Sequence, residues 1–228
     1  MTSAAEHLYD LLDDLASRTG GPRELRTCGG RLPWPRRGVY FFFEPGEARS
    51  DGRLRVVRVG THALRLGSGS TLWGRLSQHR GNLGGTNPGG GSHRGSIFRL
   101  HVGEALLARD GDPDGIAASW GRGTKATPDI RSRETAHERR VSAHIGAMPF
   151  LWVAIDDDPG PGSDRGLIER STIAILSTSP TDQPSPTWLG QWANRPVIRS
   201  SGLWNVNHIG ERPDLTALDR LEYWISKA

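Results

Sequence analysis

The first third of the chain alternates between helical patterns and two short apolar strands. Leucines at positions 8, 11, 12 and 15 recur at helical spacing and predict an amphipathic helix over residues 4–18. The runs 39–43 and 54–59 are rich in β-branched and aromatic residues, and the stretch PGEARSDG between them is a strong turn signal. We therefore expect an antiparallel hairpin, followed by a helix over residues 71–80 that Thr71 caps.

The rest of the chain predicts a third strand and several helices, separated by loops rich in Gly and Pro. The expected elements are a strand at 97–102, irregular surface structure at 109–130, an exposed charged helix at 131–145, a strand-like run at 150–155, an amphipathic helix at 164–177 and a closing helix at 214–226. Together they predict an α/β (α+β) fold. Its core is a small three-stranded antiparallel sheet flanked by helices, with loop insertions and extra terminal helices.

These elements favour one domain with additions at both ends over two separate domains. Residues 1–35 form an N-terminal helix and linker, and residues 36–210 form the main domain, with insertions at about 81–96 and 109–147. Residues 211–228 form a C-terminal helix packed on the same domain. A chain of 228 residues is long enough to bury a core of this kind.

Composition excludes some classes of protein. No apolar run approaches the roughly 20 residues that cross a bilayer, so we expect no membrane partner. The acidic, amphipathic N-terminus does not resemble a secretory signal. The single Cys28 excludes an internal disulfide and fits a reducing compartment, so the sequence predicts a cytoplasmic protein.

Arginine carries nearly all of the positive charge. Of the 29 basic residues only Lys125 and Lys227 are lysines, and the formal net charge is +4. The planar guanidinium group suits bidentate contacts with phosphate, which is compatible with a nucleic-acid partner. Codon usage in a GC-rich genome explains the same bias, so the charge alone does not decide between the two.

The helix at 71–80 carries two polar side chains beside its apolar stripe. Leu72, Arg75, Leu76 and His79 lie at positions i, i+3, i+4 and i+7, so Arg75 and His79 project from adjacent turns near the inward face. A phosphate group would satisfy both side chains. The alternative is an ordinary half-exposed Arg and His beside a core stripe.

The helix at 164–177 places a carboxylate within its apolar arc. Glu169 projects between positions 168, 172, 173 and 176, where a charge is costly unless it is paired or bound to a metal. Mg²⁺ is a plausible partner, because one or two carboxylates and substrate phosphates often hold it. A buried ion pair with an arginine is the alternative.

Two further features have ordinary structural explanations. Strand alternation directs Tyr40 to the opposite face from its neighbours, where a core tyrosine would need no special role. The glycine-dense loop at 81–96 lacks a phosphate-loop pattern, but its His93 and Arg94 could close over DNA if the loop is not simply a flexible surface segment.

In their order along the chain, these residues resemble the GIY-YIG nuclease superfamily. Gly38-Val39-Tyr40 is similar to its GIY element, and Arg58-Val59-Gly60 is similar to a degenerate YIG element. The pattern Leu72-x-x-Arg75-Leu76-x-x-His79 resembles the helix that follows. An arginine followed four residues later by a histidine is most similar to the type II restriction endonucleases of this superfamily.

The later part of the signature lies far along the chain. Glu169 resembles the metal-binding glutamate of the superfamily, and Asn205, in the stretch GLWN, resembles the asparagine that closes the motif. The resemblance covers about residues 36–207, with long insertions between the motifs.

The resemblance implies a metal-dependent endonuclease that hydrolyses DNA phosphodiester bonds by a one-metal mechanism. It assigns Mg²⁺, or Mn²⁺, to Glu169 and activation of the attacking water to Tyr40, with Arg58 placed to favour the ionised phenol. Arg75 would stabilise charge on the phosphorane, and His79 would position the water or accept its proton.

The sequence also departs from the family pattern. Arg58 stands where the second motif tyrosine belongs, so the role of that tyrosine is either unfilled or taken by Arg58 or His62. The gap before Asn205 is long, and Asn207 or His208 could be the true equivalent.

Two alternatives to a nuclease remain. One is a GIY-YIG-like DNA-binding module that lost catalysis together with the second tyrosine. The other is an unrelated small-molecule enzyme or interaction protein. Symmetric double-strand cutting would favour a homodimer.

Overall fold

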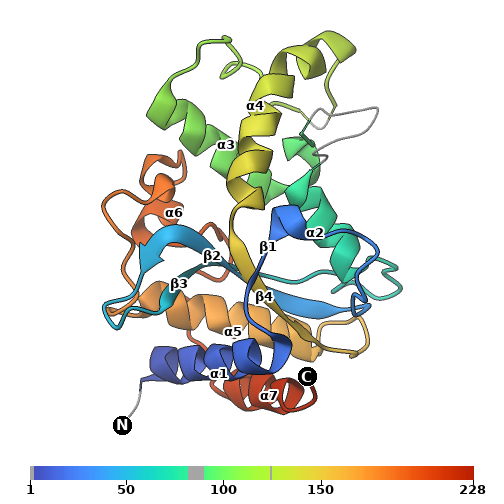
Figure 1. Ribbon diagram of the computed structural model, residues 1–228, viewed down its shortest axis with the longest axis vertical. Coiled ribbons are helices and arrows are strands. Elements are labelled where there is room, and N and C mark those ends of the chain that lie inside the picture. The colour runs from blue at the N-terminus through green and yellow to red at the C-terminus, as the bar shows by residue number, and fades with distance from the viewer. Residues whose placement is uncertain (1–2, 82–89, 124) are drawn as a thin grey trace.

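An antiparallel sheet lies between two layers of helices in the computed structural model, which describes residues 3–81, 90–123 and 125–228 (Figure 1). The helices are α1 (Ala4–Thr19), α2 (Leu72–Arg80), α3 (Ile97–Asp110), α4 (Pro128–Gly146), α5 (Asp164–Thr178), α6 (Pro196–Ser201) and α7 (Thr216–Ile225). The strands are β1 (Arg23–Glu24), β2 (Gly38–Ala48), β3 (Leu54–Gly60) and β4 (Pro149–Ala154). Short 3₁₀ turns follow β1 and precede α3 and α6.

The predicted hairpin is confirmed, and it forms half of the sheet. The strand order is β1-β4-β2-β3, and each neighbouring pair is antiparallel. In the hairpin Tyr40 faces Gly60 and Phe42 faces Arg58, and the register shifts after Phe42. The sheet therefore has four strands among the described residues rather than the three expected, because β1 adds a two-residue edge strand beside β4.

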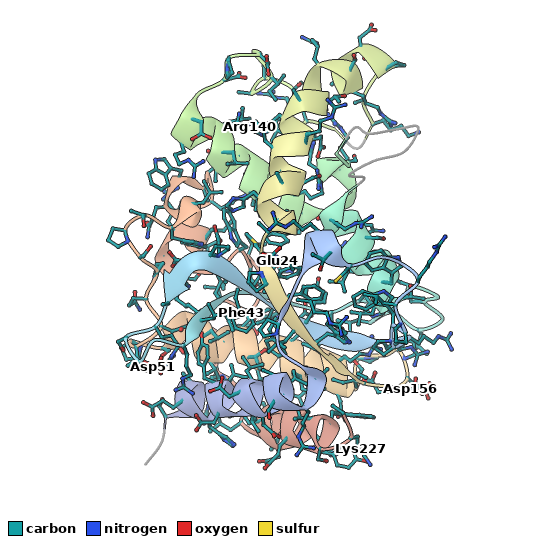
Figure 2. All side chains as sticks on the ribbon, viewed as in Figure 1. Glu24, Phe43, Asp51, Arg140, Asp156 and Lys227 are labelled. Atoms are coloured by element: carbon teal, nitrogen blue, oxygen red, sulfur yellow. The ribbon has the colours of Figure 1, made fainter. Side chains whose placement is uncertain are left out.

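The two faces of the sheet bury different side chains, as strand alternation requires. Val39, Phe41 and Phe43 of β2 pack with apolar side chains of α1, α5 and α7. Tyr40 and Phe42 face the other way and pack with residues of α2, α3 and α4. Figure 1 shows α1, α5 and α7 below the sheet and α3 and α4 above it, and Figure 2 shows side chains filling the space on both sides.

The strand expected at 97–102 is wrong, because this segment forms the first half of helix α3. The third main strand of the sheet is instead β4, which pairs with β2 from Gly38↔Ala154 to Phe42↔Phe150. The Ser96 side chain caps α3 by accepting a hydrogen bond from the Arg99 amide, which favours a helix at this point.

The helix expected at 131–145 exists as α4, but one of its faces is buried rather than exposed. Glu134, His137 and Glu138 are all at least 96% buried. These polar side chains face partners on α3 and on the turn before it. Because the buried face of this helix carries polar side chains, the sequence shows no apolar stripe that would predict its burial.

Four other helices, α1, α2, α5 and α7, match their predictions. Helix α2 begins after Thr71, whose hydroxyl accepts a hydrogen bond from the Gly74 amide. Helices α1 and α7 pack against α5 on the lower face.

Within the part of the chain that the structure describes, no helix is long and apolar enough to span a membrane. The division at residues 35 and 210 stays a prediction.

Candidate active site

The hairpin places Tyr40 directly across from Gly60 on the neighbouring strand. The two residues face each other in the β2–β3 register. A Cβ atom at Gly60 would lie only 2.4 Å from the Tyr40 hydroxyl and 2.5 Å from its Cζ atom. The glycine of the second motif is therefore required by the close approach of the tyrosine of the first.

We expect Gly60→Ala to destabilise the protein by about 1–3 kcal/mol, the usual range for overpacking a buried site. The Tyr40 ring packs edge-on against Phe42 and His79, so it has little room to move away from the added methyl group. The midpoint of urea unfolding measures this effect. Gly160→Ala is the matched control, since a Cβ atom there meets nothing within 4 Å. Equal midpoints for the two variants would contradict the close approach.

Helix α2 delivers His79 to the same phenol. The His79 ring is fully buried, and its Nε2 atom lies 2.9 Å from the Tyr40 hydroxyl. Its Nδ1 atom lies 2.7 Å from Ser96 Oγ. Burial lowers the pKa of His79 well below its ordinary value, and the positive charges of Arg58, Arg75 and Arg99 act in the same direction. The imidazole is therefore neutral near pH 7.

Helix α5 brings the distant carboxylate to the end of strand β3. Glu169 is half-buried, and its Oε1 atom accepts a hydrogen bond of 3.1 Å from the Thr61 amide. Burial raises the pKa of the Glu169 carboxyl above its ordinary value, although Arg58 and the Thr61 amide oppose the shift. A carboxylate in this environment is stabilised by an additional positive charge.

Arg58 and Arg75 meet Glu169 in one surface pocket. Thr61 and Asn205 also contribute to its lining. Arg58 is 94% buried, and its guanidinium donates to the Trp204 carbonyl over 3.0 Å and lies 4.8 Å from the centre of the Phe98 ring. Arg75 is partly exposed and donates to Gln78 over 3.1 Å. Two guanidinium groups and one carboxylate therefore line the pocket.

Asn205 joins this pocket to the edge of the sheet. Its side-chain amide donates to the Val59 carbonyl over 2.8 Å and accepts from the Val59 amide over 3.1 Å. The neighbouring Trp204 amide donates to the Val57 carbonyl. Asn207 and His208 also line the pocket, but Asn205 is the one with this two-way contact to β3. The choice among the three as the motif residue stays a prediction.

Tyr40 and His79 lie in the layer behind the pocket. Both side chains are fully buried, and neither belongs to the pocket lining. Arg58 connects the two layers, because it lines the pocket and its positive charge acts on both Tyr40 and His79. The expected set thus comes together in two layers, with Arg58, Arg75, Glu169 and Asn205 at the surface and the Tyr40–His79 pair beneath.

His62 lies outside the pocket lining, buried in the loop that follows β3. Burial and the nearby Arg165 lower the pKa of His62 to about 4, so its ring is neutral near pH 7. Its position gives no direct support for the substrate role considered for it.

His93 and Arg94 also lie outside the pocket lining, and both are held by acidic side chains of α4. His93 Nδ1 lies 2.9 Å from Glu138, and Arg94 makes a bidentate ion pair with Glu134 at 2.6 and 3.0 Å. Their contacts fix the turn before α3 to α4. Residues 82–89 of the glycine-dense loop lie outside the described residues.

Sequence patterns alone missed Thr61 and Ser96. The Thr61 amide binds Glu169 through the backbone, and no side-chain pattern reveals such a contact. Ser96 did carry a signal, since a serine before the run IFRLHVGEALL is a typical N-cap.

A metal ion at the pocket would have few protein ligands. Within residues 3–81, 90–123 and 125–228, no group of three or more His, Cys, Asp or Glu side chains could hold a metal ion. Glu169 is the carboxylate that lines the pocket. The donor set therefore fits a hard ion that keeps most of its ligands from water and phosphate, as Mg²⁺ does.

Comparison with known proteins agrees with this architecture. A model of the GIY-YIG domain family matches residues 1–228. Searches of curated proteins and of solved structures returned no match. A GIY-YIG domain indicates nuclease activity in general terms. With Tyr40 paired to Gly60 across the hairpin and a family match over its full length, the chain belongs to the GIY-YIG nuclease superfamily.

Proposed function

We propose that the chain is a metal-dependent endonuclease that hydrolyses DNA phosphodiester bonds at the pocket lined by Arg58, Arg75 and Glu169. One observation carries the proposal: a carboxylate and two guanidinium groups share a surface pocket that Arg58 links to a buried Tyr40–His79 pair. The nuclease family makes DNA the expected substrate.

Glu169 would hold one Mg²⁺ or Mn²⁺ ion. Its raised pKa reflects a buried carboxylate that lacks enough positive charge, and a divalent ion would supply that charge. When bound, the ion would neutralise charge on the scissile phosphate and on the leaving oxygen. Phosphate oxygens and water would complete its ligands.

Tyr40 and His79 would form the proton path. The Tyr40 oxygen takes a proton from the attacking water, while the phenol proton passes to His79 Nε2. The water oxygen then bonds to phosphorus, and the bond from phosphorus to the leaving sugar oxygen breaks. Because burial keeps His79 neutral near pH 7, its Nε2 atom is available as the acceptor.

Arg58 and Arg75 would bind the phosphate. Their guanidinium groups can each donate two hydrogen bonds to phosphoryl oxygens and stabilise the charge that develops during attack. Tyr40 is fully buried in the free protein, so its role as a base requires the side chains in front of it to move and admit water when DNA binds. Arg58 would take the place of the second motif tyrosine as the group whose charge acts on the Tyr40 hydroxyl.

Supercoiled plasmid incubated with Mg²⁺, Mn²⁺ or EDTA tests the proposal. We expect nicked or linear product with either ion and none with EDTA. Salt-sensitive DNA binding without cleavage in Mg²⁺, Mn²⁺ or EDTA would instead identify a catalytically impaired DNA-binding module. This second candidate function is tested because Arg58 stands at the position of the second motif tyrosine. No finding supports a homodimer, and a single nick per event would fit one site in one chain.

A further inference from the structure

Ser96 contacts His79 on the side of the ring that faces away from Tyr40. Its hydroxyl oxygen lies 2.7 Å from His79 Nδ1, and it also accepts a hydrogen bond of 3.3 Å from the Arg99 amide as the N-cap of α3. Ser96 is 98% buried. One hydroxyl therefore serves both as a helix cap and as the partner of a buried imidazole nitrogen.

The proton of the neutral His79 ring can lie on either nitrogen, and each nitrogen faces one hydroxyl group, Nε2 that of Tyr40 and Nδ1 that of Ser96. Among the described residues, His79 Nε2 is the hydrogen-bond partner of the phenol, and the positive charge of Arg58 acts on the same hydroxyl. A positive charge beside the phenol favours an orientation in which the oxygen lone pairs face Arg58 and the phenol proton points to Nε2. A neutral imidazole has one N–H group, which is then at Nδ1 and donates to Ser96 Oγ.

The backbone of His79 is held by the same helix. Arg99 is fully buried, and its Nη1 atom donates to the His79 carbonyl and to Ser142 Oγ, each over 2.9 Å. Arg99 also pairs with Glu138 of α4. The chain between α2 and β4, which contains α3 and α4, therefore fixes His79 through both its side chain and its backbone (Figure 1).

We propose that Ser96 is a positioning residue that fixes the tautomer of His79, with the proton on Nδ1 and with Nε2 free to accept the phenol proton of Tyr40. Its catalytic importance rests on the nuclease function proposed above, whereas the tautomer itself does not. Helices α3 and α4, which lie between α2 and β4 in the chain, would thus hold His79 in place from outside the pocket lining. The competing explanation is that Ser96 is only a helix cap.

Nitrogen-15 NMR of the imidazole rings distinguishes the two explanations without an activity assay. We expect the free protein to show His79 with a protonated Nδ1 and an unprotonated Nε2, and His79→Gln assigns the signals. Ser96→Gly removes the hydroxyl but keeps a residue that N-cap positions tolerate, and it should move His79 toward the other tautomer. Ser96→Thr keeps the hydroxyl and should leave the tautomer unchanged.

The control is Ser3→Gly, which removes the equivalent cap of α1, remote from His79 in sequence and in the fold. It should leave the His79 signals as they are. A wild-type His79 with its proton on Nε2, or a Ser96→Gly variant with the wild-type tautomer, would overturn the proposal. If Ser96→Gly does not fold, the wild-type and Ser96→Thr spectra still decide it.

Single-turnover cleavage provides the second readout. We expect Ser96→Gly to slow cleavage on the order of 10- to 100-fold, as is typical of residues that orient a functional histidine, with DNA affinity unchanged and Ser96→Thr restoring the rate. Equal rates for Ser96→Gly and Ser3→Gly would contradict a positioning role. A wild-type protein that cleaves no DNA would refute the proposed function instead, and the NMR result would still decide the tautomer.

Discussion

Replacing Glu169 with glutamine is expected to abolish Mg²⁺-dependent cleavage of DNA while leaving the fold intact. Glutamine has the same shape and can still accept the hydrogen bond from the Thr61 amide, but it cannot balance the charge of a divalent ion. Losing the ion removes several kcal/mol of transition-state stabilisation, which corresponds to a rate reduction on the order of 10³-fold or more. Single-turnover cleavage of plasmid measures this loss.

The same variant tests the metal site without any catalysis. Because the pKa of Glu169 is raised in the folded protein, the folded state binds more protons than the unfolded state between the unfolded value, about 4.3, and the folded value. Stability therefore falls as the pH rises through that window. In EDTA at pH 7 we expect Glu169→Gln to unfold at a higher temperature than the wild type, with the difference vanishing below the window.

Addition of Mg²⁺ should reverse that order. A ligand that binds only the folded state stabilises it by about 2.7 kcal/mol at one hundred times its Kd, and this gain should appear in the wild type and be absent from Glu169→Gln. Glu222→Gln, an exposed carboxylate-to-amide change on α7, is the matched control and should behave as the wild type. Equal stabilisation of both Glu variants by Mg²⁺ would place the ion elsewhere.

Replacing Tyr40 with phenylalanine is expected to slow cleavage by about 10²- to 10⁴-fold, the usual contribution of a positioned general base. The ring would still fill the space above Gly60 and pack against Phe42, so the fold should persist. His79 Nε2 would lose its partner, at a cost of about 1–3 kcal/mol for an unsatisfied buried group. DNA affinity should stay the same, because the pocket arginines are unchanged.

The control for this substitution is Tyr223→Phe, which removes a hydroxyl from a tyrosine that is 50% exposed on α7. It should affect neither stability nor cleavage. A Tyr40→Phe variant that cleaves at the wild-type rate would show that the buried phenol takes no part in the reaction. Loss of DNA binding along with cleavage would indicate a structural role for the hydroxyl instead.

The hairpin and the helix after it could be predicted because the residues that define each element lie within or directly beside it. The turn-forming stretch after Phe43 and the capping hydroxyl of Thr71 act within a few residues of the elements they define. Gly60 also belongs to this local part, since its close contact with Tyr40 follows from pairing within one hairpin.

The same reasoning misplaced the third strand because α3 buries polar residues. Arg99 and His101 are both at least 99% buried beside Phe98 and Val102, so the segment IFRLHV reads as alternating rather than helical. The fourth strand escaped prediction for a different reason. Strand β1 has only two residues, and its pairing with Phe150 of β4 is a long-range contact.

The sequence predicted which residues belong to the site, but not that they lie in two layers. Glu169 lies more than a hundred residues after its Thr61 partner, and only the packing of α5 against the sheet brings them together. The motif order identified Tyr40 and His79, but it could not show that both would be fully buried outside the pocket lining. His93 and Arg94 attracted attention as basic side chains, yet both are held by acidic partners on a distant helix.

Cleavage of supercoiled plasmid by the double variant Tyr40→Phe, Glu169→Gln tests most directly that these two layers form one nuclease site. The wild type, the double variant and the control pair Tyr223→Phe, Glu222→Gln would be compared in Mg²⁺, after a cooperative unfolding transition establishes that each is folded. The account predicts cleavage by the wild type and the control pair, and none above background by the double variant. Cleavage by the double variant at the wild-type rate would contradict it.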